Sequence, residues 1–248
     1  MIAGAVATTR VSQAAAAARE AMHRRGATHD GLTGLPNRAL LHERLERAAE
    51  LARLRPDYVA ALLFLDFDGF KAVNDTLGHV AGDQLLRGIA ARIGCCLRKT
   101  DAVARLSPEE RLPTPRPRRE KATAATEEQQ AQKVPTAARL GGDEFCVFLP
   151  ALRHRDDVAL VANRLVAAFR RPQEVAGQEV TTTVSIGVTL IAGDRCTADA
   201  VLHDADVAMY ASKRAGGDRW TRSDEVGQSP LLGVGRPADR AAVRRLAS

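Results

Sequence analysis

Residues 63–83 read LFLDFDGFKAVNDTLGHVAGD, and this stretch decides the fold. Its first residues end a continuous apolar run, YVAALLFLDF at 58–67, which predicts a central strand buried on both faces. The strand delivers Asp66 and Asp68 at its C-terminal end, with Lys71 just beyond them. Carboxylates are costly to bury in a core strand unless they hold a cation or cap the next helix. The pattern therefore predicts a functional site at this edge of the sheet.

The two carboxylates differ in what else they can do. Asp68 directly precedes the next predicted helix, so capping of that helix and metal binding both remain open for it. Asp66 has no comparable structural role, and we expect it to bind a metal ion.

A second pair of acids stands in the sequence Gly141-Gly142-Asp143-Glu144, at the tip of a later predicted hairpin. The two glycines allow a tight turn and a close approach of a ligand to the backbone. Adjacent acids repel each other unless a cation or a donor-rich ligand lies beside them. Together with the end of the apolar strand, this tip supplies oxygen ligands for Mg²⁺, the cation that accompanies nucleotide phosphates.

Working outward, apolar periodicity and turn residues predict the remaining elements. The predicted helices lie at about 1–28, 37–54, 70–77, 82–94, 156–170 and 197–214. Strands are predicted at 102–106 and on both sides of the Gly-Gly turn. A further hairpin turns near Gly177 and Gln178, with 179–191 as its second arm. This order predicts an α/β fold, more closely an α+β sandwich with a mixed, mostly antiparallel sheet flanked by helices.

Composition divides the chain into one domain and three appendages. Residues 29–218 form the predicted domain, residues 1–28 a linker helix, and residues 219–248 a polar linker or tail punctuated by Gly and Pro. Residues 107–137 are rich in Pro and charge and contain no aromatic residue. Such a segment cannot bury enough apolar surface to offset its ordering entropy, so we expect a disordered insert within the domain.

Charge and hydropathy exclude several classes of protein. The chain of 248 residues has a net charge of +6, but the predicted domain without its insert carries −1, so the excess lies in the appendages and indicates no nucleic-acid partner. No apolar run is long enough for a membrane span, and the N-terminus lacks the apolar core of a secretory signal. The four Cys show no metal-ligand spacing, and we expect free thiols in a reducing cytoplasm.

Five motifs in order resemble the GGDEF domain family, the diguanylate cyclases. They are DGLTGLPNR at 30–38, DFDGFKAVNDTLGHVAGD at 66–83, ARLGGDEF at 138–145, VSIGV at 184–188 and ADVAMYASK at 205–213. The resemblance covers residues 29–106 and 138–218 and implies a fold like those of the polymerase palm and adenylate cyclase. It also implies an activity. Two subunits that face each other as a homodimer each bind one GTP, and the 3′-hydroxyl of one nucleotide attacks the α-phosphate of the other in line. The products are cyclic di-GMP and two pyrophosphates, and the cofactor is Mg²⁺, or Mn²⁺ in its place, with two ions per active site.

The resemblance also assigns roles to individual residues. The implied catalytic residues are Asp143, Glu144 and Lys71; the implied metal ligands are Asp66, Asp143 and the backbone carbonyl of Phe67; the implied substrate-binding residues are Asn74, Asp83, Gly69, Phe70 and Lys213. The chemistry of the guanine readers agrees, because Asp83 can accept from guanine N1–H and the 2-amino group while Asn74 donates to O6. Adenine would leave these groups unpaired, at about 1–3 kcal/mol each. Helix capping by Asn74 and Asp83, and a merely solvated Lys213, are the simpler alternatives.

Three features bear on how far the resemblance extends. Gly217 stands where the family usually has an Arg, so one phosphate contact is missing. The insert interrupts a motif that is continuous in other members of the family. Ala-Arg-Leu occurs at both 104–106 and 138–140, so either copy could pair with the second hairpin strand. Arg98 and Asp101 resemble the RxxD inhibitory site that binds the cyclic dinucleotide product, with an ordinary surface ion pair as the alternative. A second function therefore stays open: a catalytically weak GGDEF domain that binds GTP or cyclic di-GMP as a signalling module.

Overall fold

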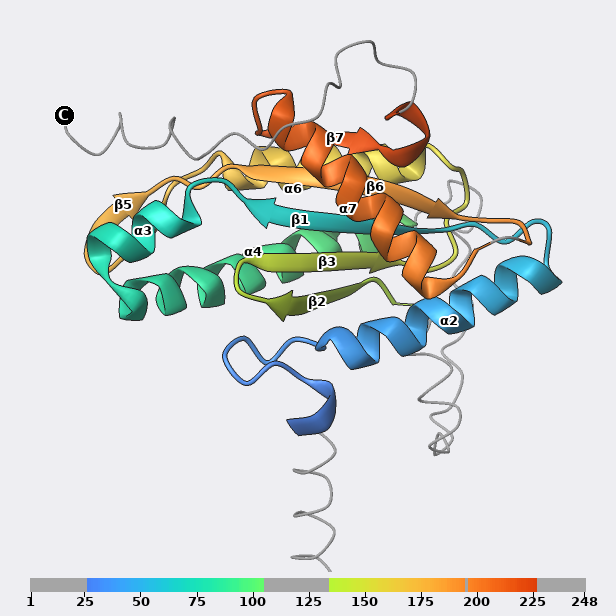
Figure 1. Cartoon of the computed structure of the whole chain (residues 1–248), viewed down its shortest axis with the longest axis horizontal. Coiled ribbons are helices and arrows are strands. Elements are labelled where there is room, and N and C mark those ends of the chain that lie inside the picture. Colours follow the sequence, from blue (N-terminus) through green and yellow to red (C-terminus); the bar gives the residue numbers. More distant parts are fainter. Residues whose placement is uncertain (1–25, 105–133, 195, 227–248) are drawn as a thin grey trace, which may run out of the picture.

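The computed structural model describes residues 26–104, 134–194 and 196–226 (Figure 1). The elements are α2 (Arg38–Leu54), β1 (Ala60–Phe67), α3 (Phe70–Leu77), α4 (His79–Ala104), β2 (Thr136–Gly141), β3 (Glu144–Leu149), α6 (Asp157–Phe169), β4 (Gln173–Val175), β5 (Gln178–Val180), β6 (Val184–Ile191), α7 (Ala198–Arg214), β7 (Arg219–Arg222) and the 3₁₀ turn η1 (Ser223–Glu225). Within α4, the backbone of residues 98–104 is helical, but their side chains lie outside the described part.

The main sheet has five strands in the order β2-β3-β1-β6-β7. The central strand β1 is antiparallel to β3 and to β6, while β6 and β7 are parallel. Helices cover both faces: α7 crosses the near face of the sheet in Figure 1, and α4 and α6 lie behind it. The structure confirms the expected mixed, mostly antiparallel sheet flanked by helices.

Alternation along β1 explains its continuous apolar sequence. Leu63 and Leu65 pack on the α4 and α6 side, whereas Leu62 and Phe64 pack on the α2 and α7 side. Both faces are therefore buried, as the apolar run predicts.

Close packing fixes α7 against the sheet. A Cβ added at Gly187 in β6 would lie 1.9 Å from the backbone carbonyl oxygen of Ala205 and 2.2 Å from the backbone nitrogen of Met209. No side chain fits there, so α7 rests directly on the strand backbone. This contact brings the C-terminal end of α7, with Lys213, to the C-terminal end of β1.

The expectations for the insert and its borders need correction. Residues 102–104 continue α4, so a strand beginning at 102 is wrong; residues 105 and 106 lie outside the described residues, as does 107–133, the greater part of the expected insert. Thr136 and Ala137, also assigned to the insert, are buried in β2. The second copy of Ala-Arg-Leu, at 138–140, is therefore the one that lies in the strand beside β3.

Two further boundaries differ from the expectation. The run 179–191 does not form one arm of a hairpin: β5 pairs with β4, while β6 starts after a break and joins the main sheet beside β1. Residues 219–225 of the expected tail form β7 and η1, because β7 adds a parallel edge strand to β6 and Trp220 packs against the core. Residues 227–248 and 1–25 lie outside the described ranges.

Among the described residues, no helix is both long and apolar enough to cross a membrane. Within the described residues, Cys95, Cys96, Cys146 and Cys196 form no disulfide bonds.

Candidate active site

The register of the sheet brings the two acidic sequences together. Antiparallel pairing of β1 with β3 places Asp66 directly opposite Glu144. Asp143 precedes Glu144 in the turn between β2 and β3, where Gly141 and Gly142 adopt positive φ angles of 150° and 51°. Three acids from two distant parts of the sequence, Asp66, Asp143 and Glu144, thus form one acidic edge at the end of the central strand.

Burial gives Asp66 an unusual electrostatic state. Its side chain is 14% exposed, and burial raises the pKa of its carboxyl to about 6, with the charges of Asp143 and Asp68 adding to the rise and Lys213 opposing it. The Nζ atom of Lys213 lies 2.6 Å from Oδ1 of Asp66. This contact is an ion pair without hydrogen-bond alignment, because Oδ1 remains a buried acceptor that lacks a hydrogen bond among the described residues.

These groups fit a divalent cation. No group of three or more His, Cys, Asp or Glu in the described part of the chain forms a complete metal cage. Mg²⁺ is commonly held by one or two carboxylates together with substrate phosphates, so a complete protein cage is not required. Asp66, with an unsatisfied buried oxygen beside a second carboxylate on Asp143, offers such a site.

Asp68 has a role that the sequence does not reveal. Its carboxylate accepts hydrogen bonds from Thr183 Oγ1 at 2.7 Å, from Ser185 Oγ at 2.9 Å and from the backbone N–H of Asp218 at 3.2 Å. It does not cap α3, whose N-cap is Gly69 with a φ of 82° and no side-chain cap. The capping interpretation is therefore wrong, and Asp68 instead ties the end of β1 to β6 and to the loop after α7.

The start of α3 presents unpaired donors. The N-cap is Gly69, and among the described residues no side chain accepts from the backbone N–H groups of the first turn, which begins at Phe70. Lys71 is exposed in the same turn. Free N–H groups, a helix dipole and an ammonium group together favour an anion such as a phosphate.

The expected guanine readers lie on neighbouring helices. Gly78, with a φ of 83°, turns the chain between α3 and α4. The carboxamide of Asn74 lies against Gly82, since a Cβ there would be 1.9 Å from Asn74 Oδ1. Asp83 is exposed on α4, one residue beyond that contact. Neither residue lies at the end of its helix, so helix capping is wrong for both.

A partly buried ion pair holds the acidic hairpin in place. Arg139 in β2 donates from Nη1 to both carboxylate oxygens of Asp30 at 3.0 Å, and from Nε and Nη2 to the carbonyl oxygen of Gly142 at 3.0 and 2.8 Å. Burial raises the pKa of Asp30, but hydrogen bonds from Thr33 and Arg139 outweigh it and leave the pKa below its ordinary value. The sequence did not predict this pair, although Asp30 lies in DGLTGLPNR and Arg139 in ARLGGDEF.

The position of Gly217 explains one departure from the family pattern. Its φ is 70°, and a Cβ there would lie 2.9 Å from Asp68 Oδ2. The hydrogen bond between Asp68 and Asp218 depends on this tight loop, and a larger residue at 217 would be strained. Arg219, two residues further on, donates from Nε to the carbonyl oxygen of Gly217 at 3.4 Å. Arg98 and Asp101 both lie on α4, but their side chains are outside the described part.

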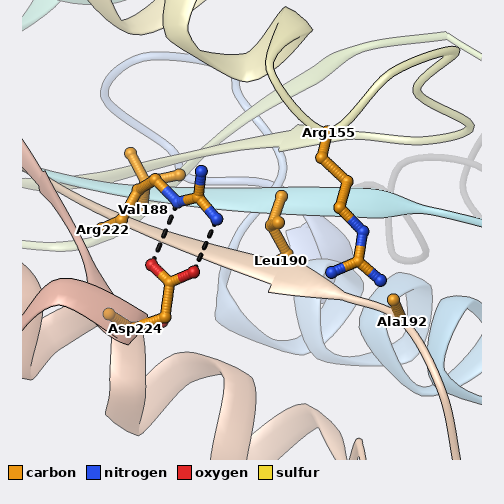
Figure 2. Close-up of a pocket in the computed structure, with 7 residues that line it drawn as sticks. Arg155, Val188, Leu190, Ala192, Arg222 and Asp224 are labelled. Carbon is orange, nitrogen blue, oxygen red and sulfur yellow. Dashed lines mark hydrogen bonds and ion pairs between the residues drawn. The ribbon is translucent and has the colours of Figure 1, made fainter.

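A separate hollow of about 180 Å³ lies away from these residues (Figure 2). Arg155 and Arg222 flank its floor, to which Leu190 contributes, and Arg222 is paired with Asp224. Leu190 is paired in register with Ala61, five residues before Asp66 along β1. Val188, which also lines the hollow, is paired in register with Leu63, three residues before Asp66. At about 3.4 Å per residue the hollow is therefore roughly 10 Å or more from the acidic edge along β1, and no candidate site residue lines it.

Comparison with known proteins agrees with this geometry. The sequence matches the family described as "Diguanylate cyclase, GGDEF domain" over residues 27–133 and 121–219. The chain belongs to the GGDEF family. These ranges span the β2–β3 hairpin with its GGDEF sequence, β1 with its paired acids, and the helix that carries Lys213.

Individual relatives place the domain among named enzymes. The chain is 38% identical over 189 residues to the diguanylate cyclase TpbB of Pseudomonas aeruginosa, and 39% identical over 190 residues to the bifunctional diguanylate cyclase/cyclic di-GMP phosphodiesterase MucR of the same organism. These matches cover 76% and 77% of this chain but only 35% and 22% of the relatives. The chain thus spans about a fifth to a third of their length.

Solved structures confirm the fold. The GGDEF domain of TpbB superposes with a TM-score of 0.59 at 35% identity, covering 81% of this chain and 99% of that one. The coiled coil and GGDEF domain of DgcB from Caulobacter crescentus, solved with cyclic di-GMP, gives a TM-score of 0.64 at 28% identity and covers 88% and 96%.

Proposed function

We propose that this GGDEF domain is a diguanylate cyclase that condenses two GTP molecules into cyclic di-GMP and two pyrophosphates. The observation that carries the proposal is the acidic edge, where Asp66 at the end of β1 lies opposite Glu144 and beside the hairpin tip with Asp143. The diguanylate cyclase activity named for TpbB, at 38% identity, supports it.

The chain's own residues bind and orient the nucleotide. Asp66, Asp143 and the carbonyl of Phe67 would hold Mg²⁺, or Mn²⁺ in its place, as two ions per site. When bound, these ions supply Lewis acidity that lowers the pKa of a 3′-hydroxyl and neutralises the leaving pyrophosphate. The N–H groups at Gly69 and Phe70, together with Lys71 and Lys213, would bind the phosphates.

Guanine recognition follows from the α3–α4 corner. Asp83 accepts from N1–H and the 2-amino group, and Asn74 donates to O6. Adenine would leave the Asp83 carboxylate facing no donor, so GTP is preferred over ATP.

The reaction requires a second copy of the chain. One bound GTP supplies the 3′-hydroxyl and the other its α-phosphate, so two sites must face each other as a homodimer. Glu144 is 43% exposed at the edge that would face the second nucleotide, and its carboxylate would accept the proton of the attacking hydroxyl. We place this activity in the cytoplasm, where GTP is available, and within residues 29–218.

Product analysis tests the proposal. The full chain, incubated with GTP and Mg²⁺ and resolved by chromatography and mass spectrometry, should yield cyclic di-GMP, and ATP should yield no cyclic dinucleotide. Glu144→Gln should reduce product formation at least 100-fold, whereas Glu43→Gln on the exposed face of α2 should not. A wild-type protein that binds GTP and forms no product would refute the activity.

A second candidate is a GGDEF domain that binds GTP or cyclic di-GMP without efficient turnover. Gly217 favours this candidate, because it stands where the family usually has an arginine and so lacks one phosphate contact. The chain is also 33% identical over 193 residues to NbdA of Pseudomonas aeruginosa, which is named as a cyclic di-GMP phosphodiesterase. Arg98 and Asp101 on α4 are the proposed binding site for cyclic di-GMP as a feedback inhibitor. Calorimetry with each nucleotide separates the candidates, because a binding module would show affinity without product.

A further inference from the structure

The ion pair between Lys213 and Asp66 lies where the proposed metal would bind. The ammonium is 2.6 Å from Oδ1 of Asp66, in a contact where the lysine is 35% exposed and the aspartate 14%. Oδ1 is also the oxygen that lacks a hydrogen bond. In this state the lysine is the counter-ion of a buried carboxylate rather than a free phosphate-binding group.

We propose that Lys213 is a built-in competitor for the metal, which must leave Asp66 before a divalent cation can bind. The proposal rests on the proposed function, since it takes Asp66 as a metal ligand. Mg²⁺ binds carboxylate oxygens at 2.0–2.1 Å. An ammonium 2.6 Å from the same oxygen would repel that ion at short range and occupy the space that the ion needs.

The surroundings allow the lysine side chain to move but hold its backbone. Ser212, the preceding residue, is buried and donates from Oγ to the carbonyl oxygen of Ile186 at 2.8 Å, and lies 2.8 Å from Thr221 Oγ1. Packing of α7 on Gly187 fixes the same helix. Displacement is therefore a rotation of the four-carbon side chain, not a shift of α7.

The displaced ammonium needs a new anionic partner. Asp68 already accepts three hydrogen bonds, and Asp143 would be shared with the metal. The phosphates of a nucleotide, bound at the start of α3, would accept the ammonium. A bound nucleotide gives the displaced ammonium a new partner, which favours metal binding at Asp66. A bound metal releases Lys213 for the phosphates, which favours nucleotide binding. The two binding events are therefore coupled through Lys213.

The test measures metal binding without nucleotide. Mn²⁺ is titrated into the full chain in the absence of GTP, with free Mn²⁺ followed by electron paramagnetic resonance. Lys213→Met removes the competing cation and should tighten Mn²⁺ binding by about 10-fold, in the range of ordinary coupling between sites. Lys71→Met removes an equal charge that is not paired with Asp66, and should change Mn²⁺ affinity by less than about 3-fold.

Thermal unfolding supplies the second measurement. In a chelator, Lys213→Met should melt below the wild type because Asp66 loses its counter-ion, and saturating Mn²⁺ should raise its melting temperature more than that of the wild type. If Lys213 contacts only phosphate, Lys213→Met should bind Mn²⁺ with the same affinity as the wild type. Equal or weaker Mn²⁺ binding by Lys213→Met, or no Mn²⁺ binding by either protein, overturns the inference. Tighter binding by the variant in a protein that makes no cyclic di-GMP would uphold this inference while refuting the proposed function.

Discussion

Arg139→Met tests whether the ion pair with Asp30 positions the acidic hairpin. The substitution keeps the length of the side chain but removes two hydrogen bonds to Asp30 and two to the carbonyl of Gly142. Gly142 is exposed, so water can replace its lost donors. The main loss is the charged pair, whose partners are only 11% and 21% exposed.

The size of the effect follows from that burial. A hydrogen-bonded charged pair that is mostly but not fully buried contributes about 2 kcal/mol, between the values for exposed and fully buried pairs. For a domain of this size, that loss lowers the melting temperature by about 4–8 °C. Because the same bonds hold the tip that carries Asp143 and Glu144, turnover should fall by roughly 10- to 100-fold, the effect of a misplacement of about 1 Å.

The assay combines thermal unfolding by circular dichroism with the rate of cyclic di-GMP formation at saturating GTP. Arg47→Met is the matched control, since Arg47 pairs with Glu43 on the surface of α2, where the side chains are 47% and 51% exposed. That pair should contribute less than about 0.5 kcal/mol and leave turnover unchanged. An Arg139→Met protein with the expected loss of stability and normal turnover would refute the positioning role, and one with unchanged stability would refute the energetic argument.

Three further predictions concern residues around the site. Gly82→Ala would push aside the Asn74 carboxamide, so the KM for GTP should rise several-fold with little change in melting temperature, and an unchanged KM would remove Asn74 from guanine recognition. Gly187→Ala would force α7 off β6, where the obstacle is backbone, so the free energy of unfolding should fall by about 3 kcal/mol or more, as measured by urea denaturation. In a chelator, the raised pKa of Asp66 means that the folded state binds its proton more tightly than the unfolded state, so stability should fall as pH rises from about 4 through 6. Asp66→Asn should abolish that part of the slope, and an identical pH profile for both proteins would contradict the raised pKa.

The central part of the fold could be predicted from the sequence because its signals are local. A continuous apolar run predicted β1, and the spacing of apolar residues predicted α2, α6 and α7 within one or two residues of their bounds. The sequence also predicted that Asp66 and Asp143 belong to one site, because each lies at the end of a predicted strand.

Other features depend on contacts between distant residues and could not be predicted in this way. β7 has a short polar sequence that does not predict a strand by itself. It forms a strand because its backbone pairs with the edge of β6. The hydrogen bonds of Asp68 and the pairing of Arg139 with Asp30 link residues about 110 or more positions apart. The end of α4 was misjudged because Ala-Val-Ala at 102–104 suits a helix as well as a strand, and the preceding helix decides between them.

The most direct test of the proposed function is the stoichiometry of the reaction. The full chain is incubated with GTP and Mg²⁺, and consumed GTP, released pyrophosphate and cyclic di-GMP are measured in the same sample. The proposed mechanism predicts one pyrophosphate for each GTP and one cyclic di-GMP for every two, with all three lost in Asp143→Asn. Release of inorganic phosphate and GDP, or retention of intact GTP by a folded wild-type protein, would contradict it.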